Sequence, residues 1–493
     1  MNQTLTQRER REKRHDSLRL VDPLFAAPDA LVEELIARAR AAQHLIEGWT
    51  EAQIDQLLLA LAQMIADHAE DLAVATIRET EMGNLRDKSF KNRIASLGIY
   101  ERLAEQIGRG VIGFDSQRQI AEVASPVGIV VGLAPATHPV ATFIFKALIA
   151  IKGRNALILS PSRRAQQVSN QVGALIQQGL RQAGAPADLV QWVQSGGRRE
   201  TTAALMSHPQ VGLILATGGA AMVKAAYRSG TPTIGVGPGN APVLIDADAD
   251  VAHAARGIVE SKAFDNGLIC GAENSLVAVT DIRAGLVAEL ERHGAAVLSS
   301  AEAARLLSAA VDSQSHRFKP RVIGQSAATL AAWAHIQRPF AIQLLVVPTA
   351  SVAAENYLAA EKLAPVVGLF TVADADQGLR ICRALLEIEG AGHTAIIHTQ
   401  DTDLIARFAA ELPASRILVN SPGTQGVLGL TTGLALSMTL GCGTWGGAST
   451  TDSITYRHLL NIKRIAYSTS KRAEMDANEH LADIQPLTHY LNK

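Results

Sequence analysis

The stretch PVGIVVGLAPATHPVATFIFKALIAIKGRNALILSP, residues 126–161, decides the fold. It begins with an apolar run that is typical of a buried strand, and after a proline-containing loop it continues with the apolar segment HPVATFIFKALIAIKGR. The run approaches membrane-spanning length, but Pro135, His138, Pro139 and Lys146 interrupt it. The sequence therefore predicts a buried strand, a loop and a helix, followed by the short strand NALILS.

Alternating helices and strands continue on both sides of this stretch. Upstream, residues 28–108 have apolar residues at helical spacing, and residues 110–125 have the pattern of extended segments. Downstream follow the helix QQVSNQVGALIQQGLRQAG, the strand LVQWVQ, the helix TTAALMSHP and the strand VGLILAT. This alternation predicts an α/β unit whose parallel sheet is covered by helices on both faces.

A second α/β unit is predicted from about residue 251. Its expected strands are SLVAV, AAVL, LLVVP, TAIIHT and SRILVN, and helices such as QGLRICRALLEIEG separate them. Residues 421–447 are too rich in glycine for one regular element, so we expect a loop that returns toward the first unit. The polar end of the chain, from about residue 467, is predicted to be a tail or a peripheral helix.

The composition excludes several classes of function. The chain has 493 residues, 47% of them hydrophobic and 19% charged, so it buries large cores and is not one small module. The 46 Lys and Arg residues nearly balance the 47 Asp and Glu residues, and aromatic residues make up only 4%. We therefore expect no general attraction to nucleic acid or to an anionic membrane, and small molecules are the expected partners.

The three cysteines, Cys270, Cys382 and Cys442, lie far apart and form no C-x-x-C pair. This spacing predicts neither a metal site nor a disulfide framework and fits a reducing cytoplasm. Cys382 is expected to be an inert core residue of a helix, whereas the glycine neighbours of Cys442 could leave it exposed. Residues 1–25 are basic without an apolar region, which predicts a flexible tail; a docking or encapsulation peptide is the alternative.

Two glycine loops lie close together in the sequence. The strand VGLILA runs into Thr217, Gly218 and Gly219 and then into a helix, so backbone N–H groups and the positive helix end could hold a phosphate. The loop IGVGPGNAP follows, with Gly235 and Gly237. Two such loops favour a cradle for a cofactor or an acyl group, and tight turns required only by packing are the alternative.

Cys270 is the candidate nucleophile. It lies in FDNGLICGAENS, residues 264–275, immediately before the predicted strand SLVAV. A thiolate attacks a carbonyl carbon well, and backbone donors or a helix end can lower the pKa of such a thiol. An inert core cysteine is the alternative.

Taken together, these segments resemble the CoA-acylating branch of the aldehyde dehydrogenase superfamily, including the aldehyde dehydrogenase half of bifunctional aldehyde-alcohol dehydrogenases. The matching stretches run in the family's order from about residue 120 to 465. They are SPVGIVVGLAPATHP, IFKALIAIKGRNALILSP, ATGGAAMVKAAYRSGTPTIGVGPGNAPVLID, FDNGLICGAENS, EKLAPV, GAGHTAIIH, TLGCGTWGG and HLLNIK. The resemblance implies an α/β fold with a Rossmann-type cofactor domain, an α/β catalytic domain and a small oligomerisation element.

The resemblance also implies a division of the chain. Residues 26–250 would form the nucleotide-binding domain, with an extended oligomerisation segment near residues 110–125. Residues 251–440 would form the catalytic domain that carries the nucleophile. Residues 441–493 would return to the cofactor domain, add an oligomerisation segment and end in a tail. A homodimer or homotetramer is expected, in the cytoplasm or within a bacterial microcompartment whose shell the basic tail would bind.

The reaction follows from the same resemblance. Cys270 matches the nucleophile that forms a thiohemiacetal with an aldehyde; hydride then leaves to the nicotinamide, and CoA releases the acyl group from the resulting thioester. Hydrolytic relatives carry a water-activating Glu in the loop that matches IGVGPGNAP, and this loop has no carboxylate. The expected products are acyl-CoA and NAD(P)H. A hydrolytic dehydrogenase and a non-catalytic nucleotide-binding or shell-associated protein are the alternatives.

Three further residues are assigned to the reaction centre. The resemblance implies that the oxyanion is held by the backbone N–H of Cys270 and by the loop with Thr137 and His138. Acylating relatives usually have Asn at the position of His138, which could donate a hydrogen bond, add positive charge or only satisfy a loop carbonyl. If it acts on the substrate, sulfoacetaldehyde or succinate semialdehyde becomes the alternative to acetaldehyde. His393 matches a family histidine that could deprotonate CoA or position the acyl group, and a packed histidine is the alternative.

The remaining assignments concern the nicotinamide cofactor. Many relatives have an acidic residue at the position of Arg163, where it binds the adenine ribose, so the arginine favours NADP over NAD. CoA phosphate binding and a solvated basic pair are the alternatives for Arg163. Glu361 in EKLAP matches the carboxylate that holds the nicotinamide ribose, and a surface Glu at a helix end is the alternative. The full set of cofactor-binding residues is Ser160, Pro161, Arg163, Thr217, Gly218, Gly219, Gly235, Gly237 and Glu361.

Overall fold

Residues 126–161 form the strand, loop, helix and strand that the sequence predicts. In the computed structural model, which describes residues 30–194 and 199–468, they become β3 (Ile129–Ala134), α7 (Pro139–Lys152) and β4 (Ala156–Pro161). Every residue of α7 is buried, as is typical of a helix that is apolar on all sides. Pro139 is the first residue of α7, a position that needs no backbone N–H donor.

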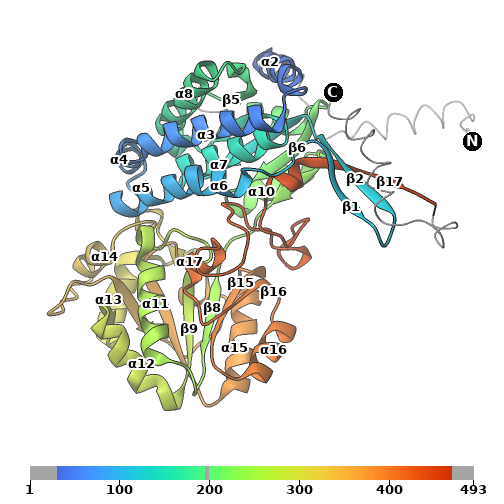
Figure 1. Ribbon diagram of the computed structural model, residues 1–493. Helices are drawn as coiled ribbons and strands as arrows, with labels where there is room; N and C mark the ends of the chain where they lie inside the picture. Colours follow the sequence, from blue (N-terminus) through green and yellow to red (C-terminus); the bar gives the residue numbers. More distant parts are fainter. Residues whose placement is uncertain (1–29, 195–198, 469–493) are drawn as a thin grey trace, which may run out of the picture.

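The first unit, the upper one in Figure 1, contains a parallel sheet of five strands. Their order is β5-β4-β3-β6-β7. The added strands are β5 (Val190–Trp192), β6 (Val211–Ala216) and β7 (Thr233–Gly235). The chain first adds strands on one side of β3 and then on the other, so the order reverses between β3 and β6. In open parallel sheets, ligands bind at the carboxyl ends of the strands beside such a reversal.

Helices cover this sheet, and the first of them lie in the region that the sequence predicts to be helical. The N-terminal helices are α2 (Ala30–Ile46), α3 (Glu51–Asp67), α4 (Ala69–Thr80), α5 (Leu85–Arg93) and α6 (Ile99–Leu103), with a short π-helix between the last two. Later in the chain follow α8 (Gln166–Gln182), α9 (Arg199–Ser207) and α10 (Ala220–Arg228). Thr50 begins α3 with a reciprocal capping box, in which its hydroxyl accepts from the N–H of Gln53.

The second unit contains a seven-stranded parallel sheet in the order β10-β13-β14-β9-β8-β15-β16. Its strands are β8 (Ala241–Ile245), β9 (Glu273–Val279), β10 (Ala295–Val297), β13 (Leu344–Pro348), β14 (Val366–Val372), β15 (Gly392–His398) and β16 (Ala414–Val419). Two corrections follow. The predicted boundary near residue 250 lies too late, because β8 already pairs with β9 and β15. In addition, β14 is a central strand that is absent from the strands predicted from sequence.

Helices pack on both faces of the second sheet. They are α11 (Val251–Ala263), α12 (Thr280–Arg292), α13 (Ser300–Ala310), α14 (Ala327–Trp333), α15 (Ala375–Ile388), α16 (Thr402–Glu411) and the short α17 (Gly423–Val427). Cys382 of α15 is fully buried in an apolar cluster with Leu385 and Phe408, as expected of a core cysteine. Cys442 is also fully buried, so its glycine neighbours do not expose it.

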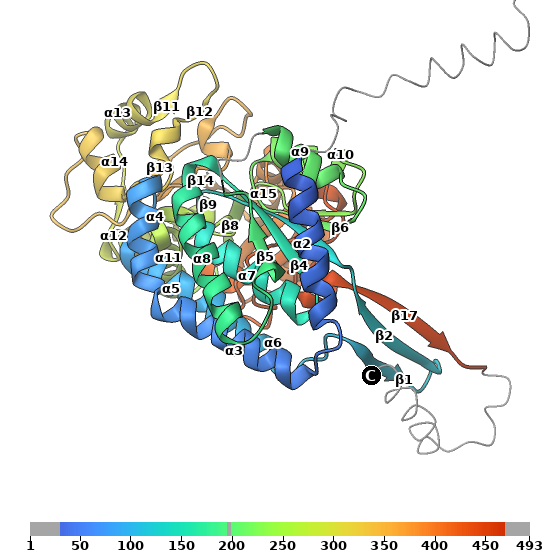
Figure 2. The same cartoon turned by 90° about the horizontal axis from the view of Figure 1, so that it is seen from above.

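A small antiparallel sheet projects from the body of the molecule (Figure 2). It is formed by β1 (Gly110–Asp115), β2 (Ile120–Pro126) and β17 (Leu460–Ala466), in that order. The sequence predicts that residues 110–125 and a segment near the chain's end form one element, and the structure pairs them. A second antiparallel pair, β11 (Val311–Asp312) with β12 (Arg317–Phe318), forms a short hairpin in the second unit.

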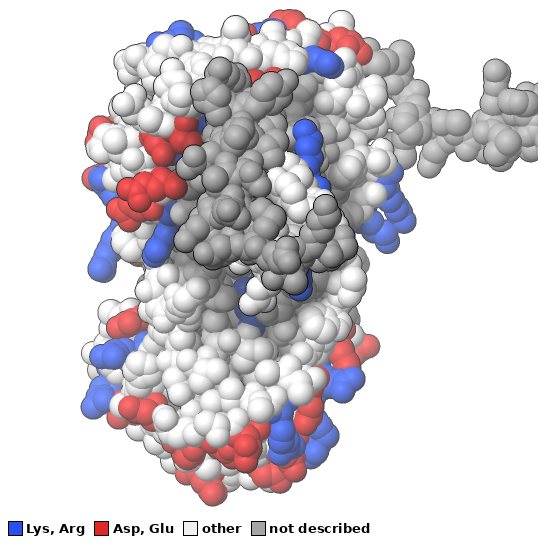
Figure 3. Space-filling view, turned by 45° about the vertical axis from the view of Figure 1, so that its right-hand side comes forward, with Lys and Arg blue, Asp and Glu red and all other residues white. Residues whose placement is uncertain are grey.

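Charged side chains of both signs are interspersed on the face drawn in Figure 3. Among the described residues, no helix is both long and apolar enough to span a bilayer. The expectations for residues 1–25 and for the tail after residue 468 fall outside the described part of the chain.

A buried lysine joins the two strands at the reversal point of the first sheet. Lys146 of α7 donates hydrogen bonds from Nζ to the carbonyl oxygens of Leu133 at 2.6 Å and Leu215 at 2.7 Å, near the carboxyl ends of β3 and β6. Burial lowers the pKa of Lys146 to about 7, from an ordinary value of 10.5. The folded protein therefore releases a proton there that the unfolded chain still binds between these pH values.

We expect Lys146→Met to remove a pH-dependent part of the stability. Because the unfolded chain binds the extra proton, this lysine makes the free energy of unfolding rise between pH 7 and 10.5, by up to about 1.4 kcal/mol per pH unit. The free energy of unfolding of wild type minus that of the variant, measured by urea unfolding, should therefore grow from pH 7 to pH 9.5. A difference that stays constant over this range would contradict the lowered pKa.

Candidate active site

The amino ends of three neighbouring strands bring the candidate reaction centre together. Cys270 precedes β9, residues 236–240 lead into β8, and His393 is the second residue of β15. These strands lie side by side in the order β9-β8-β15 and are parallel, so their amino ends share one edge of the sheet. Residues far apart in the sequence therefore meet in one site.

Cys270 and His393 are in direct contact. The Sγ of Cys270 lies 3.1 Å from Nε2 of His393, and Nδ1 of His393 lies 2.9 Å from Oγ1 of Thr394. Burial, together with the charge of Arg416, lowers the pKa of His393 to about 3. The ring is therefore neutral at physiological pH, and a proton on Nδ1 leaves Nε2 free to accept the proton of the thiol.

The thiol itself is not activated in the free protein. Burial, with smaller contributions from the nearby Glu361 and Cys442, raises the pKa of Cys270 to about 12, while Arg416 acts in the opposite direction. The lowering by backbone donors or a helix end that the sequence suggested is thus outweighed by desolvation. Cys270 needs a proton acceptor at the moment of attack, and His393 is in contact with it.

Gly239 allows the backbone of the nucleophile to approach closely. A Cβ at this position would lie 1.9 Å from the carbonyl oxygen of Cys270, which leaves no room for a side chain. The N–H of Gly239 donates to Oε1 of Glu361 at 3.0 Å. Burial and the neighbouring Glu389 raise the pKa of Glu361 to about 8, so this carboxyl group is mostly protonated at neutral pH. Glu361 is therefore part of the centre rather than a surface residue.

A narrow hollow lies beside Cys270, between the loops before β8 and β9 and the segment that carries Glu361. Its lining residues are Gly239, Asn240, Lys262, Gly267, Ile269, Cys270, Ala272, Asn274, Glu361 and Leu363. Three of them, Asn240, Lys262 and Asn274, are buried polar residues. The Oδ1 atom of Asn274 is buried without a hydrogen-bond partner in the described part of the chain, as expected of a group that faces a polar ligand or water.

The turn after β6 has room for a ligand. Gly219 is exposed and is the N-cap of α10, and a Cβ added there would have no heavy atom within 4 Å. Thr217 is buried and pairs with Thr439 through their hydroxyl groups at 3.3 Å. Free backbone N–H groups at an open helix end fit the pyrophosphate of a nicotinamide cofactor. Gly218 lies between these residues in the same turn.

In the second glycine loop, packing within the protein already restricts one of the two glycines. A Cβ at Gly235 would lie 2.6 Å from Cγ1 of Val223, and the Gly235 N–H donates to the hydroxyl of Tyr227 at 2.9 Å. At Gly237 a Cβ would lie 3.7 Å from Sγ of Cys442, which is ordinary contact. Close packing on α10 thus explains Gly235, whereas Gly237 has more space.

The remaining cofactor assignments lie at the carboxyl end of β4. Ser160 and Pro161 are buried, and the Ser160 hydroxyl lies 2.8 Å from that of Thr202. Arg163 follows in a short 3₁₀-helix and is exposed. This is the edge of the sheet at which the turn after β6 also lies, so the two segments face the same crevice.

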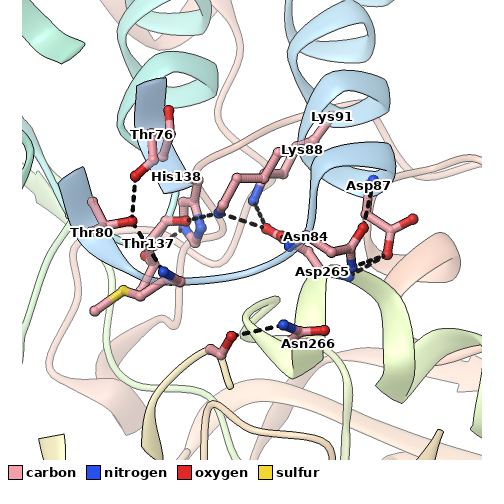
Figure 4. A network of polar contacts seen from close by, with 12 residues as sticks. Thr76, Thr80, Asn84, Asp87, Lys88, Lys91, Thr137, His138, Asp265 and Asn266 are labelled. Atoms are coloured by element: carbon pink, nitrogen blue, oxygen red, sulfur yellow. Dashed lines mark hydrogen bonds and ion pairs between the residues drawn. The ribbon is translucent and has the colours of Figure 1, made fainter. Parts of the chain in front are cut away.

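Thr137 and His138 follow β3 at the same edge (Figure 4). The carbonyl oxygen of Thr137 accepts a hydrogen bond from Nζ of Lys88 at 3.2 Å. The hydroxyl of Thr137 lies 3.4 Å from Nε2 of His138. Burial, with the charges of Lys91 and Lys88, lowers the pKa of His138 well below its usual value. His138 is therefore neutral, and its buried Nδ1 has no partner among the described residues.

Several residues of the site are absent from the sequence assignments. They are Lys88, Lys91, Gly239, Lys262, Asp265, Asn274 and Arg416. Gly239, Asp265 and Asn274 lie inside stretches that the sequence analysis already singled out, so the motifs around them could have indicated all three. The lysines and Arg416 carry no local signal, because their partners are distant in sequence.

The whole α/β part of the chain is similar to proteins of one known family. Residues 24–449 match the model of the aldehyde dehydrogenase family. The chain is 36% identical over 450 residues to the bifunctional aldehyde-alcohol dehydrogenase AdhE of Escherichia coli K12, covering 90% of this chain and 50% of that protein. It is 34% identical over 450 residues to the acetylating succinate-semialdehyde dehydrogenase of Clostridium kluyveri, covering 91% of this chain and 98% of that protein.

A solved structure gives the same result. The acetylating aldehyde dehydrogenase from Geobacillus thermoglucosidasius superposes with a TM-score of 0.85 at 37% identity, over 90% of this chain and 97% of that one. The predicted α/β fold class is thereby confirmed. The chain spans about half the length of the bifunctional relative, so its match concerns only that part. The chain belongs to the aldehyde dehydrogenase family.

Proposed function

We propose that the chain is a CoA-acylating aldehyde dehydrogenase, which oxidises a short aldehyde with NADP or NAD and transfers the acyl group to CoA. The observation that carries the proposal is the 3.1 Å contact between Cys270 and a neutral His393, beside a loop at residues 234–242 that has no carboxylate of its own. Both the acetylating relative and the acetylating structural neighbour support the acyl transfer.

The residues of this chain act in a definite order. His393 accepts the thiol proton at Nε2 while Sγ of Cys270 bonds to the aldehyde carbon, and the carbonyl oxygen takes up negative charge. The Cys270 N–H and the Thr137–His138 loop stabilise that oxygen. A bound nicotinamide would supply the hydride acceptor, and the acyl group would remain on Cys270 as a thioester. His393 releases that proton to water, takes the thiol proton of CoA as the CoA sulfur attacks the thioester, and returns it to the departing Cys270.

The nicotinamide cofactor would be held by residues of the crevice described above. The open turn at Thr217–Gly219 and the α10 terminus fit its pyrophosphate, and Arg163 at the end of β4 fits a 2′-phosphate. Glu361 is the candidate partner of the nicotinamide ribose, and Ser160, Pro161, Gly235 and Gly237 shape the surrounding backbone. No metal takes part in this proposal.

Acetaldehyde or a short homologue is the proposed substrate. Burial lowers the pKa of His138 well below its usual value, so this side chain offers no positive charge that would attract an anionic aldehyde. A small anionic aldehyde, sulfoacetaldehyde or succinate semialdehyde, is the second candidate. The relative named for succinate semialdehyde matches almost its full length and supports that alternative.

A hydrolytic dehydrogenase is the second candidate activity, because Glu361 brings a carboxyl group to the loop that lacks one. Its pKa of about 8 makes it a poor base at neutral pH, so water attack should be slow there. A non-catalytic nucleotide-binding or shell-associated protein would have no use for the Cys270–His393 contact.

The remaining proposals concern assembly and location. We propose a homodimer or homotetramer formed through the β1-β2-β17 sheet, whose strands are paired within the chain as an extended arm. A cytoplasmic enzyme, free or enclosed in a microcompartment, fits this function. Docking through residues 1–25 concerns a segment outside the described residues.

The first test is a CoA-dependence assay. NAD(P)H formation by the purified protein should require CoA with acetaldehyde at neutral pH, because no ionised carboxylate activates water efficiently. The assay compares acetaldehyde, sulfoacetaldehyde and succinate semialdehyde, each with and without CoA and with either cofactor. Equal turnover without CoA would assign the hydrolytic reaction, and no turnover with any aldehyde would refute the proposal.

Removing the nucleophile Cys270 and removing its proton acceptor His393 should affect turnover to different degrees. Cys270→Ala should abolish acyl transfer while cofactor binding persists. His393→Ala should slow the first turnover at pH 7 by about 10²–10⁴-fold, with a smaller loss at pH 10, where hydroxide removes the thiol proton. Stopped-flow NAD(P)H formation measures both. Cys382→Ala, a change in the core of α15, serves as the control; retained turnover in Cys270→Ala would refute the nucleophile.

Reversing one exposed charge should change the cofactor preference. Arg163→Glu should lower the ratio of kcat/KM for NADP over NAD by about tenfold or more, since a guanidinium–phosphate contact is lost and repulsion is gained. The control is Arg181→Glu at the far end of α8, which makes the same charge change on an exposed residue. An unchanged ratio in Arg163→Glu would reject a 2′-phosphate site there.

A further inference from the structure

The turn immediately before the nucleophile has an unusual backbone. Asp265, Asn266 and Gly267 have consecutive positive φ angles of 47°, 56° and 74°. Side-chain-bearing residues rarely adopt this left-handed conformation, and Asp and Asn tolerate it best. Two such residues in a row persist only where surrounding contacts hold them, and such strained turns cluster at functional sites.

The contacts that hold this turn come from α5 and the residue before it (Figure 4). The Asp265 side chain has no exposed surface, and its Oδ2 accepts from Nζ of Lys88 at 3.2 Å and from Nζ of Lys91. Its Oδ1 accepts from the N–H of Asn84 at 3.2 Å, and its own N–H donates to Oδ2 of Asp87 at 2.8 Å. Asp265 thus receives hydrogen bonds from three residues and donates to a fourth.

The neighbouring backbone is shaped around this carboxylate. A Cβ at Gly83 would lie 2.0 Å from Oδ1 of Asp265, so only glycine fits there. The N–H of Gly83 and Nδ2 of Asn266 both donate to the carbonyl oxygen of Gly324, each at 2.8 Å. The turn is therefore fixed on two sides, by the first unit and by a loop of the second.

Lys88 connects this turn to the second loop of the reaction centre. Besides Asp265, its Nζ donates to the carbonyl oxygen of Thr137 at 3.2 Å. One ammonium group therefore joins the segment that carries Cys270 to the Thr137–His138 loop, which lies on the other unit. A shift of Asp265 would move both.

Burying the charges of Asp265, Lys88 and Lys91 is an inefficient way to stabilise a fold. The side chains of Lys88 and Lys91 are each only 3% exposed and share one fully buried carboxylate. Buried ion pairs pay a large desolvation penalty and are often no more stabilising than apolar packing, although removing one partner is strongly destabilising. Such a cluster instead fixes the relative positions of the groups that it joins.

We propose that Asp265, held by Lys88 and Lys91, is a positioning residue that fixes the turn so that Sγ of Cys270 meets His393 and the Thr137–His138 loop faces the same point. The part of this inference that concerns the aldehyde rests on the proposed function. The part that concerns Cys270 and His393 does not, because the thiol can be probed without a substrate.

The test begins with Asp265→Asn, which keeps the size and the tolerance for a left-handed backbone but removes the charge. The first-turnover rate at saturating aldehyde should fall by about 100-fold, the loss expected of a misplacement of about 1 Å, whereas the cofactor Kd should change less than about threefold. Iodoacetamide alkylation of Cys270 at pH 7 should slow toward the rate of His393→Ala. Alkylation within threefold of wild type would overturn the proposal.

Two further variants separate positioning from stability. Asp265→Asn with Lys91→Met removes an ammonium group that has lost its partner, so the Tm should recover while the first-turnover rate and alkylation stay low. Recovery of these rates together with the Tm would overturn the proposal. Lys88→Met leaves Asp265 paired with Lys91 and should reduce the first-turnover rate by about tenfold; an unchanged rate would also overturn it.

The control is Glu302→Gln, which breaks the Arg338–Glu302 ion pair, whose shortest distance is 2.7 Å, away from the turn. Glu302→Gln should lower the Tm and leave the first-turnover and alkylation rates as in wild type. If this variant also changes the two rates, the rates report general stability, and the inference is overturned. If wild type oxidises no aldehyde, the proposed function fails, while the alkylation rates still decide the positioning role.

Discussion

The close approach of Gly239 to the carbonyl of Cys270 is the contact on which the rest of the site depends. It is possible only because the amino ends of β8 and β9 lie side by side in a parallel sheet and because residue 239 has no side chain. The same loop offers its N–H to Glu361. His393 enters from the adjoining β15, so register in one sheet determines the position of nucleophile, proton acceptor and carboxyl group together.

Burial dominates the electrostatics of this centre. It raises the pKa of the Cys270 thiol and the Glu361 carboxyl and lowers that of His393, so each group is held in its neutral form. A neutral centre suits a reaction in which charge develops on the carbonyl oxygen only as His393 takes the thiol proton. Charged groups such as Asp265 and its lysines are kept to one side, where they meet backbone and each other.

The sequence predicts the architecture because local patterns determine it. The β3, α7 and β4 elements follow from apolar runs and prolines, and Cys270 and His393 were found through motifs that lie in regular order. The lysine cluster could not be found in this way, because Lys88 and Asp265 are 177 positions apart and neither is unusual locally. The pKa of Cys270 was equally inaccessible, since it depends on how much water the folded chain excludes. The boundary at β8 was misplaced because a strand's sequence does not reveal which sheet it joins.

The β2-β17 pairing has a consequence for how the chain is made. Leu460 pairs with Pro126, so more than 300 residues separate partners in this ladder. During synthesis, β2 is complete more than 300 residues before β17, and its hydrogen-bonding edge stays open until β17 leaves the ribosome. Such an edge recruits other extended chains, and closing so long a loop is slow. Nascent molecules on one messenger can therefore pair with one another through this edge until β17 emerges.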